Sequence, residues 1–436
     1  MEGRQARRTS PWRFGLGMLG LTIPGYMFSS YGTYYYTEKL SLSLSLIALG
    51  TVFYTIWDAV NDPLVGFLSD RTRTRFGRRK PWILIGAPLY FIAMTLFFTP
   101  PSGMSPGGGM ALYYTAFLMM TETMSTITTV NYHSLFPELF RDTHNRTIAN
   151  SIRQALQVAA MVLSTVLVPI LAGALGYSLL GGGLALLGMG LLVFSVLGSY
   201  EDPAIQETRQ PGFVESIKAV MSNRNFWTVS FANFFYQATN GIMMAAIPFF
   251  VKYTLQLPDS SAAFITGPVF IAAIPAVFGW SAIARKIGAV KTWRLAMVWM
   301  GASFIPMLFV TQLWSTILFG ISIGVGLAGI IATLDIVNAR IIDDDASRFG
   351  LRREGIYHST INFVIRLSSL MKSLVFMLVV MWFGFESSAN PGHTPEIACR
   401  MMFSTFPLAL MALAVACTFM VKIKDTQVCS KEVTCE

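Results

Sequence analysis

The stretch "DAVNDPLVGFLSDRTRTRFGRRKPW", residues 58–82, places two carboxylates four residues apart shortly before a dense basic run. Apolar sequence continues on both sides of it. The chain is 53% hydrophobic and 13% charged, with a mean hydropathy of +0.55, whereas soluble proteins carry about 25% charged residues. These values predict an integral membrane protein. Asp58 and Asp62 then lie at bilayer depth, where a carboxylate needs a partner, a cation or a proton.

Long apolar stretches decide the fold class. A membrane-spanning helix needs about 20 mainly apolar residues, and twelve stretches of this kind occur in the chain. We therefore predict an all-α polytopic membrane protein with twelve transmembrane helices in two six-helix pseudo-repeats. The predicted spans are 13–36, 41–69, 81–99, 110–136, 150–174, 178–200, 226–253, 261–284, 293–311, 315–338, 356–384 and 397–421.

Two basic turns indicate an internal duplication. "GFLSDRTRTRFGRRK" follows the second predicted span, and "GWSAIARKIGAVK" follows the eighth, 213 residues later (Gly66 against Gly279). Duplication of this kind is typical of transporters whose site lies between two repeats. The predicted parts are an N-terminal bundle (1–200), a cytoplasmic linker with an amphipathic helix (201–225), a C-terminal bundle (226–422) and a cytoplasmic tail (423–436).

The net charge of +9 collects in alternate polar gaps between the apolar stretches. The positive-inside rule therefore predicts that these gaps and both termini are cytoplasmic, in the inner or plasma membrane. No basic stripe on a soluble face points to nucleic acid, and the four cysteines have neither zinc-ligand spacing nor a disulfide framework. We expect no cleaved signal peptide, no cofactor, contacts with membrane lipids, and a monomer.

Residues 66–79 follow the pattern G-x-x-x-D-R-x-x-x-R-x-G-R-R, which resembles the cytoplasmic signature of the major facilitator superfamily. With "WDAVNDP", "RRKPWILIG" and "RREGIY", the chain is similar to the glycoside–pentoside–hexuronide:cation symporters, the family of the melibiose permease. The resemblance covers most of the chain and implies a twelve-helix facilitator fold that works by alternating access. We predict gating roles for cytoplasmic charges, namely Asp70, Arg71, Arg75, Arg78, Arg79, Arg352, Arg353 and Glu354.

Asp58 and Asp62 are the candidate cation ligands. Four residues apart on a helix, they face the same way with Cβ atoms about 6 Å apart, and two adjacent carboxylates cannot both stay bare and ionised. Oxygen ligands suit a hard monovalent cation such as Na⁺, and a protonated acid would make the site H⁺-driven. The resemblance implies that these aspartates form the coupling-cation site, with Asn61 beside them. The alternative is an internal salt bridge that only locks helices together.

Arg366 is the candidate counter-ion, because it shares the expected depth of Asp58 and because facilitator folds place spans two and eleven side by side. Lys372, less than two turns further on, either faces the cavity or reaches an interface. Aligning "YYYTE" and "SLFPEL" with the family puts Thr22 and Thr129 where the melibiose permease has sugar-binding acids. A galactoside substrate is therefore in doubt.

Glu122 lies two helical turns before Thr129 and is either a displaced substitute for a missing acid or an acid neutralised by hydrogen bonds from Thr121, Thr126 or tyrosines. Arg153 matches a family arginine near the sugar. Further candidates for a polar cavity include Tyr34, Tyr236 and Gln237, although helix packing explains them equally well.

We expect a Na⁺- or H⁺-coupled symporter of a small polar solute, most simply a sugar, glycoside or uronide. Two alternatives stay open: a lysolipid symporter of the same superfamily, and, from another class, a polytopic membrane transferase. A transferase needs an acid–base or metal cluster at one interface, and the sequence shows none.

Overall fold

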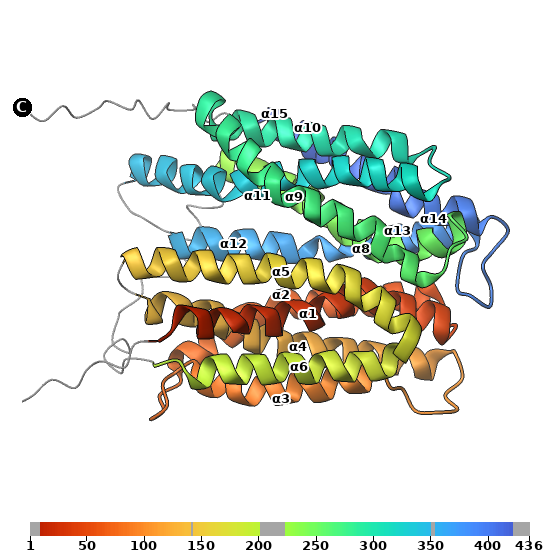
Figure 1. Ribbon diagram of the computed structural model, residues 1–436, viewed down its shortest axis with the longest axis horizontal. Helices are drawn as coiled ribbons and strands as arrows, with labels where there is room; N and C mark the ends of the chain where they lie inside the picture. The colour runs from red at the N-terminus through yellow and green to blue at the C-terminus, as the bar shows by residue number, and fades with distance from the viewer. Residues whose placement is uncertain (1–8, 141–142, 201–222, 350–353, 422–436) are drawn as a thin grey trace, which may run out of the picture. The chain divides into compact units, whose positions relative to one another are not determined.

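The computed structural model describes residues 9–140, 143–200, 223–349 and 354–421, and within these ranges every regular element is a helix (Figure 1). Each predicted span coincides with one helix or with consecutive helices, which confirms the all-α class. The elements are α1 (Pro11–Tyr34), η1 (Tyr35–Lys39), α2 (Leu44–Arg71), α3 (Lys80–Phe97), α4 (Gly108–Leu139), α5 (Thr143–Leu175), α6 (Tyr177–Leu197), α8 (Arg224–Phe249), η3 (Phe250–Thr254), η4 (Asp259–Ser261), α9 (Ala262–Ile287), α10 (Ala289–Met307), α11 (Leu313–Phe349), α12 (Glu354–Leu367), α13 (Ser369–Phe383), α14 (Pro395–Phe403) and α15 (Thr405–Phe419).

Local sequence explains several helix ends. Ser10 caps α1 by accepting a hydrogen bond from the Arg13 amide at 3.5 Å, and Pro11 occupies the first helical position. Gly384 ends α13 in the left-handed conformation, with φ 64°. The expected break between the ninth and tenth spans is real, because α10 ends at Met307 and α11 begins at Leu313.

Nine helical segments of the described chain are long and apolar enough to cross a membrane. Among the predicted spans, α1, α4 and α10 are of similar length but more polar. The stretch "TETMSTITTVN" in α4 shows why, since it places an acid and several hydroxyl groups in mid-helix. The predicted amphipathic helix near residues 213–221 lies outside the described residues.

The chain divides into two compact units, neither of which is a single stretch of sequence. Unit 1 consists of residues 1–211, 240–267 and 366–403. Unit 2 consists of residues 212–239, 268–365 and 404–436. The predicted division into an N-terminal and a C-terminal bundle stays a prediction.

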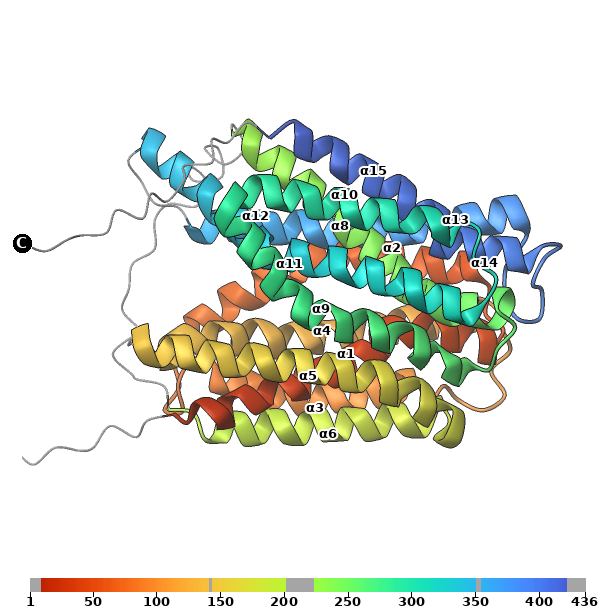
Figure 2. The ribbon, with the colours of Figure 1, turned by 45° about the horizontal axis from the view of Figure 1, so that its top comes forward.

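In unit 1, α1 packs against α5 and α6, α3 packs against α4 and α6, and α2 packs against α4 and α13 (Figures 1 and 2). Close backbone approach joins α1 to α6, since a Cβ added to Gly20 would lie 2.6 Å from the carbonyl oxygen of Gly188. Such small-residue contacts are typical of membrane helix pairs. An aromatic cluster of Phe14, Tyr132 and Phe136 fills the core beside them.

In unit 2, α10 packs against α11 and α15. Trp293 of α10 is completely buried, and the indole of Trp280 donates to the carbonyl of Val325 at 2.8 Å. Glycine at position 326 allows α11 to approach the backbone of Met300 closely.

Candidate functional site

The candidate cation site lies near the middle of α2. Asp58 and Asp62 occupy successive turns of this helix, and both carboxyl groups face the same neighbours. The side chain of Asp58 is only 2% exposed and that of Asp62 is 21% exposed. Two carboxylates this close and this buried repel each other and lose solvation, so a positive group has to compensate them.

Arg366 of α12 provides that positive group. Its Nη1 lies 3.1 Å from Oδ2 of Asp58, its Nη2 lies 2.7 Å from Oδ2 of Asp62, and its Nε donates to the same Asp62 oxygen at 2.9 Å. The planar guanidinium therefore bridges both carboxylates, which a lysine ammonium could not do with the same geometry. α12 ends at Leu367, one residue after Arg366, and α13 begins at Ser369.

Two further groups complete the surroundings of the carboxylates. The hydroxyl of Thr126 donates to Oδ1 of Asp62 at 3.0 Å. Oδ1 of Asp58 and Nδ2 of Asn61 are buried without a hydrogen-bond partner in the protein. Buried polar atoms are rarely left unpaired, and an oxygen of this kind is a ready ligand for a small cation.

Glu122 of α4 and Lys372 of α13 extend the charge cluster. The Glu122 carboxyl lies within electrostatic range of Asp58, Arg366 and Lys372. Its neutralisation by the neighbouring threonines does not occur, because Thr126 bonds to Asp62 and the Thr121 hydroxyl has no partner. The cluster thus holds three acids and two basic side chains, so one additional positive charge balances it when all are ionised.

The structure does not bring every predicted substrate residue to this cluster. Thr22 of α1 and Thr129 of α4 are half-buried. The guanidinium of Arg153 lies 3.0 Å from Nδ1 of His133 and 4.6 Å from the centre of the Phe136 ring. His133 lies eleven residues beyond Glu122 on α4, a rise of roughly 16 Å, so Arg153 belongs to a different level of the unit.

Three other candidates also lie elsewhere. Tyr34 is fully buried, and its hydroxyl donates to Oδ1 of Asp259 at 2.7 Å, in a separate polar cluster described below. Tyr236 and Gln237 lie on the part of α8 that belongs to unit 2, where Tyr236 is 4% exposed.

The basic turn after α2 has a specific partner that the sequence did not reveal. Nη2 of Arg78 lies 2.6 Å from Oε1 of Glu138, at the end of α4. Arg79 is buried, donates to the Ser69 hydroxyl at 2.6 Å and lies 3.6 Å from the same Glu138 oxygen. Arg71 and Arg75 are exposed. Arg352, Arg353 and the side chains of Asp70 and Glu354 lie outside what the structure describes.

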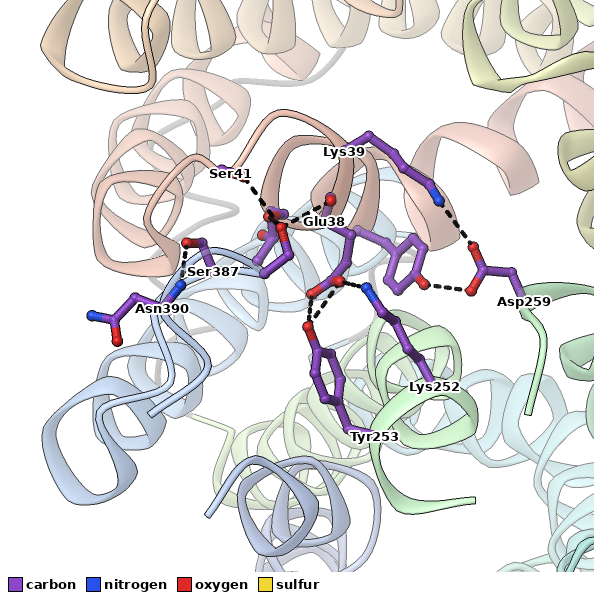
Figure 3. Close-up of polar contacts among 11 residues, drawn as sticks. Glu38, Lys39, Ser41, Lys252, Tyr253, Asp259, Ser387 and Asn390 are labelled. Carbon is purple, nitrogen blue, oxygen red and sulfur yellow. Dashed lines mark hydrogen bonds and ion pairs between the residues drawn. The ribbon is translucent and has the colours of Figure 1, made fainter. Parts of the chain in front are cut away.

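A second polar cluster of unit 1 was missed entirely (Figure 3). Glu38 accepts hydrogen bonds from Lys252 and from Tyr253, and Asp259 pairs with Lys39 at 3.5 Å. These residues lie at the end of α2 opposite the basic turn, because η1 comes just before that helix. The signal that could have found them is a second internal repeat, spaced by 215 residues.

Comparison with known proteins identifies the family. The family described as MFS/sugar transport protein matches residues 13–425. The isoprimeverose transporter of Lactiplantibacillus pentosus is 23% identical over 95% of this chain and 89% of its own length. An uncharacterized symporter of Synechocystis is 31% identical over 38% of this chain, and that match spans only 31% of the relative.

A mouse sodium-dependent lysophosphatidylcholine symporter is 38% identical over 113 residues, which are 25% of this chain and 21% of that protein. Among solved structures, a bacterial homolog of the human lysosomal transporter Spinster aligns with a TM-score of 0.73 at 13% identity, over 96% of this chain and 98% of the other. That likeness shows the fold alone.

The family consists of transporters, which excludes the membrane transferase considered from the sequence. Its match covers both predicted halves, the basic turn and the charge cluster. The chain therefore belongs to the MFS/sugar transport proteins, the glycoside–pentoside–hexuronide:cation symporters of the major facilitator superfamily.

Proposed function

We propose that this symporter couples the uptake of a small polar solute to a monovalent cation, Na⁺ or H⁺, bound at Asp58 and Asp62 with Asn61 beside them. One observation carries the proposal: Arg366 bridges both carboxylates in mid-helix. Carboxylates at bilayer depth are costly and usually mark an ion pathway. A purely structural lock would not need two acids for one arginine.

The geometry suggests how coupling works. A cation that binds Asp58 and Asp62 competes with the Arg366 guanidinium for the same oxygens, chiefly Oδ2 of each carboxylate. Arg366 released in this way can turn to the substrate or to Glu122, which lies within its electrostatic range. The balance of charges in the cluster, and with it the preferred state of the carrier, thus depends on cation occupancy.

A sugar, glycoside or uronide is the preferred substrate class. The family description and the printed name of the isoprimeverose transporter both refer to sugars. Thr22 and Thr129 stand where related carriers have sugar-binding acids, whereas Lys372 and Arg366 add positive charge near Glu122. This combination favours a solute with an acidic group over a neutral galactoside.

We also propose that the carrier resides in the cell membrane with its basic turn and both termini in the cytoplasm. The charges from Arg71 to Lys80 support this orientation through the positive-inside rule.

A lysolipid is the second candidate substrate. The supporting observation is the 38% identity over 113 residues to a protein named as a sodium-dependent lysophosphatidylcholine symporter. That match covers a quarter of the chain, so we rank it below the sugar class.

An uptake screen with the purified chain in liposomes tests both candidates. Radiolabelled pentosides, hexuronides and lysophosphatidylcholine are offered under an inward Na⁺ gradient, an inward H⁺ gradient, or no gradient. We expect one gradient to drive uphill uptake of a sugar-class solute and Asp62→Asn to abolish it. The matched control is Glu396→Gln, which removes an exposed carboxylate on α14. Gradient-driven uptake that persists unchanged in Asp62→Asn would contradict the proposal.

A further inference from the structure

The ends of α1 and α8 share a duplicated backbone motif. Each helix runs directly into a π-helical turn, η1 (Tyr35–Lys39) and η3 (Phe250–Thr254), and the two turns start 215 residues apart (Tyr35 against Phe250). Two residues after each turn comes a residue in the left-handed conformation, Ser41 and Gln256, each with φ 54°. In the described part of the chain, no other non-glycine residue has a positive φ.

The hydrogen bonds of the two motifs also correspond. The amide of Leu42 donates to the carbonyl of Tyr36 at 2.9 Å, and the amide of Leu257 donates to that of Val251 at 3.0 Å. A left-handed residue other than glycine is strained, and π-turns are rare and often lie at functional sites. The same strained turn, held at equivalent places in both halves, calls for a reason.

The two turns meet through an acid–base contact. The Glu38 side chain on η1 is completely buried, whereas Lys252 on η3 is 35% exposed. Lys252 bonds to Oε2 of Glu38, and the hydroxyl of Tyr253 lies 2.9 Å from both carboxylate oxygens (Figure 3). Both carboxylate oxygens are therefore held by donors from the other turn.

Two further contacts join the same segments. The Asp259 carboxylate of η4 accepts from the Tyr34 hydroxyl at 2.7 Å and pairs with Lys39 at 3.5 Å. The loop between α13 and α14 docks beside them, where the hydroxyl of Ser388 donates to the carbonyl of Glu38 at 3.0 Å and lies 3.2 Å from that of Ser41.

Glu38 is the group on which these contacts depend. Burial raises the pKa of its carboxyl, while Lys252 and Tyr253 oppose that rise. A proton therefore favours the buried position, and this advantage is lost as the pH rises through the pKa of the buried group. The titratable groups that face Glu38 are Tyr34, Tyr177, Lys252, Tyr253, Asp259 and Cys399.

We propose that the duplicated turns form a latch, made by Glu38, Lys252, Tyr253 and the Lys39–Asp259 pair, which closes the end of the carrier opposite the basic turn. Only the further statement that the latch parts in each transport cycle rests on the proposed function. The experiment below needs no substrate, so its result stands apart from the outcome of the uptake screen.

Cys399 is a natural reporter of the latch. It is completely buried on α14 and interacts electrostatically with Glu38 and Lys252. The measurement is the rate of N-ethylmaleimide labelling of Cys399 in the purified full chain, with Cys417, Cys429 and Cys435 replaced by serine. Each variant is compared with the unsubstituted reporter protein at the same pH, because the reactivity of the thiol itself depends on pH.

Lys252→Met leaves the buried Glu38 carboxylate without its cation. We expect labelling of Cys399 to be roughly tenfold faster at pH 8, equivalent to about 1.4 kcal/mol, and the difference to shrink toward pH 5 as Glu38 takes up a proton. The double variant Glu38→Gln/Lys252→Met removes both charges and should return close to the reporter rate. Glu38→Gln alone should have little effect, because the half-exposed Lys252 can reach solvent.

Glu396→Gln is the control, since it removes a carboxylate from α14 without touching the latch. Unchanged labelling in Lys252→Met at pH 8 would overturn the proposal, and so would a double variant as fast as Lys252→Met. A disulfide provides an independent test: Ser41→Cys/Ser388→Cys, oxidised in the Lys252→Met background, should return Cys399 to slow labelling. Failure to form this disulfide, or fast labelling despite it, would contradict the latch.

Discussion

Replacing Arg366 by alanine should destabilise the protein more than any other single change in the charge cluster. The guanidinium lies 3.1 Å and 2.7 Å from carboxylate oxygens of Asp58 and Asp62. At an effective dielectric constant of 20, each contact has an attraction of about 5–6 kcal/mol, most of which offsets the loss of hydration. Breaking a buried ion pair typically costs about 3–5 kcal/mol, and the 33% exposure of Arg366 argues for the lower end.

The partnership is tested by a double-mutant cycle. Asp62→Asn removes one charge-assisted contact, worth about 1.5–3 kcal/mol, and leaves the Asp58 pair intact. Arg366→Ala should cost about 3 kcal/mol, but the double variant should lose about 1–2 kcal/mol less than the sum, because Asp62 no longer needs a partner.

Thermal unfolding of the four purified proteins in detergent measures this coupling, since 1 kcal/mol shifts Tm by roughly 2–4 °C in chains of 150–250 residues. Arg400→Ala is the control, because its partner Glu396 is 51% exposed on the same helix and such pairs contribute only about 0.3–0.5 kcal/mol. Strictly additive losses would refute the pairing and reassign Arg366 to the substrate.

Three other predictions follow from the same structure. Asp58→Asn should abolish uphill uptake in liposomes but leave exchange across equal concentrations, because the solute can still enter the cavity; retained accumulation would count against the cation site. Arg73→Cys, on the exposed basic turn, should react with an impermeant maleimide in inverted vesicles and not in intact cells, and the opposite result would reverse the topology. Glu138→Gln should make the turn around Arg78 and Arg79 more accessible to trypsin, since both arginines contact that carboxylate; an unchanged cleavage rate would argue against it as their anchor.

The sequence predicted the fold well because the bilayer imposes a simple rule on it. Every predicted span coincides with helix, since backbone groups in lipid must be satisfied within the segment. Asp58 and Asp62 could be singled out for the same reason, because a charge in an apolar stretch is conspicuous. The resemblance to a family then suggested Arg366 as their neighbour, 304 residues away from Asp62.

The remaining parts of the sites could not be predicted from these rules. Thr126 is one of many hydroxyl groups on α4, and only side-chain geometry shows that it bonds to Asp62. The position of Arg153 depends on how His133 and Phe136 pack around it. Glu38 and Lys252 lie near span ends, where charged residues are ordinary, so neither was conspicuous until the turns that carry them were seen in contact.

The discontinuous composition of unit 1 has a consequence for biosynthesis. Asp62 enters the membrane early, but its guanidinium partner lies 304 residues further along the chain. At about 5–20 residues per second, translation delays Arg366 by roughly 15–60 s. Over that interval the two carboxylates of α2 are carried by a nascent bundle without their cation, and a proton or water has to take its place. The ribosome therefore produces the acidic half of the coupling site well before its basic half, and a stall between the two leaves an intermediate for membrane quality control to recognise.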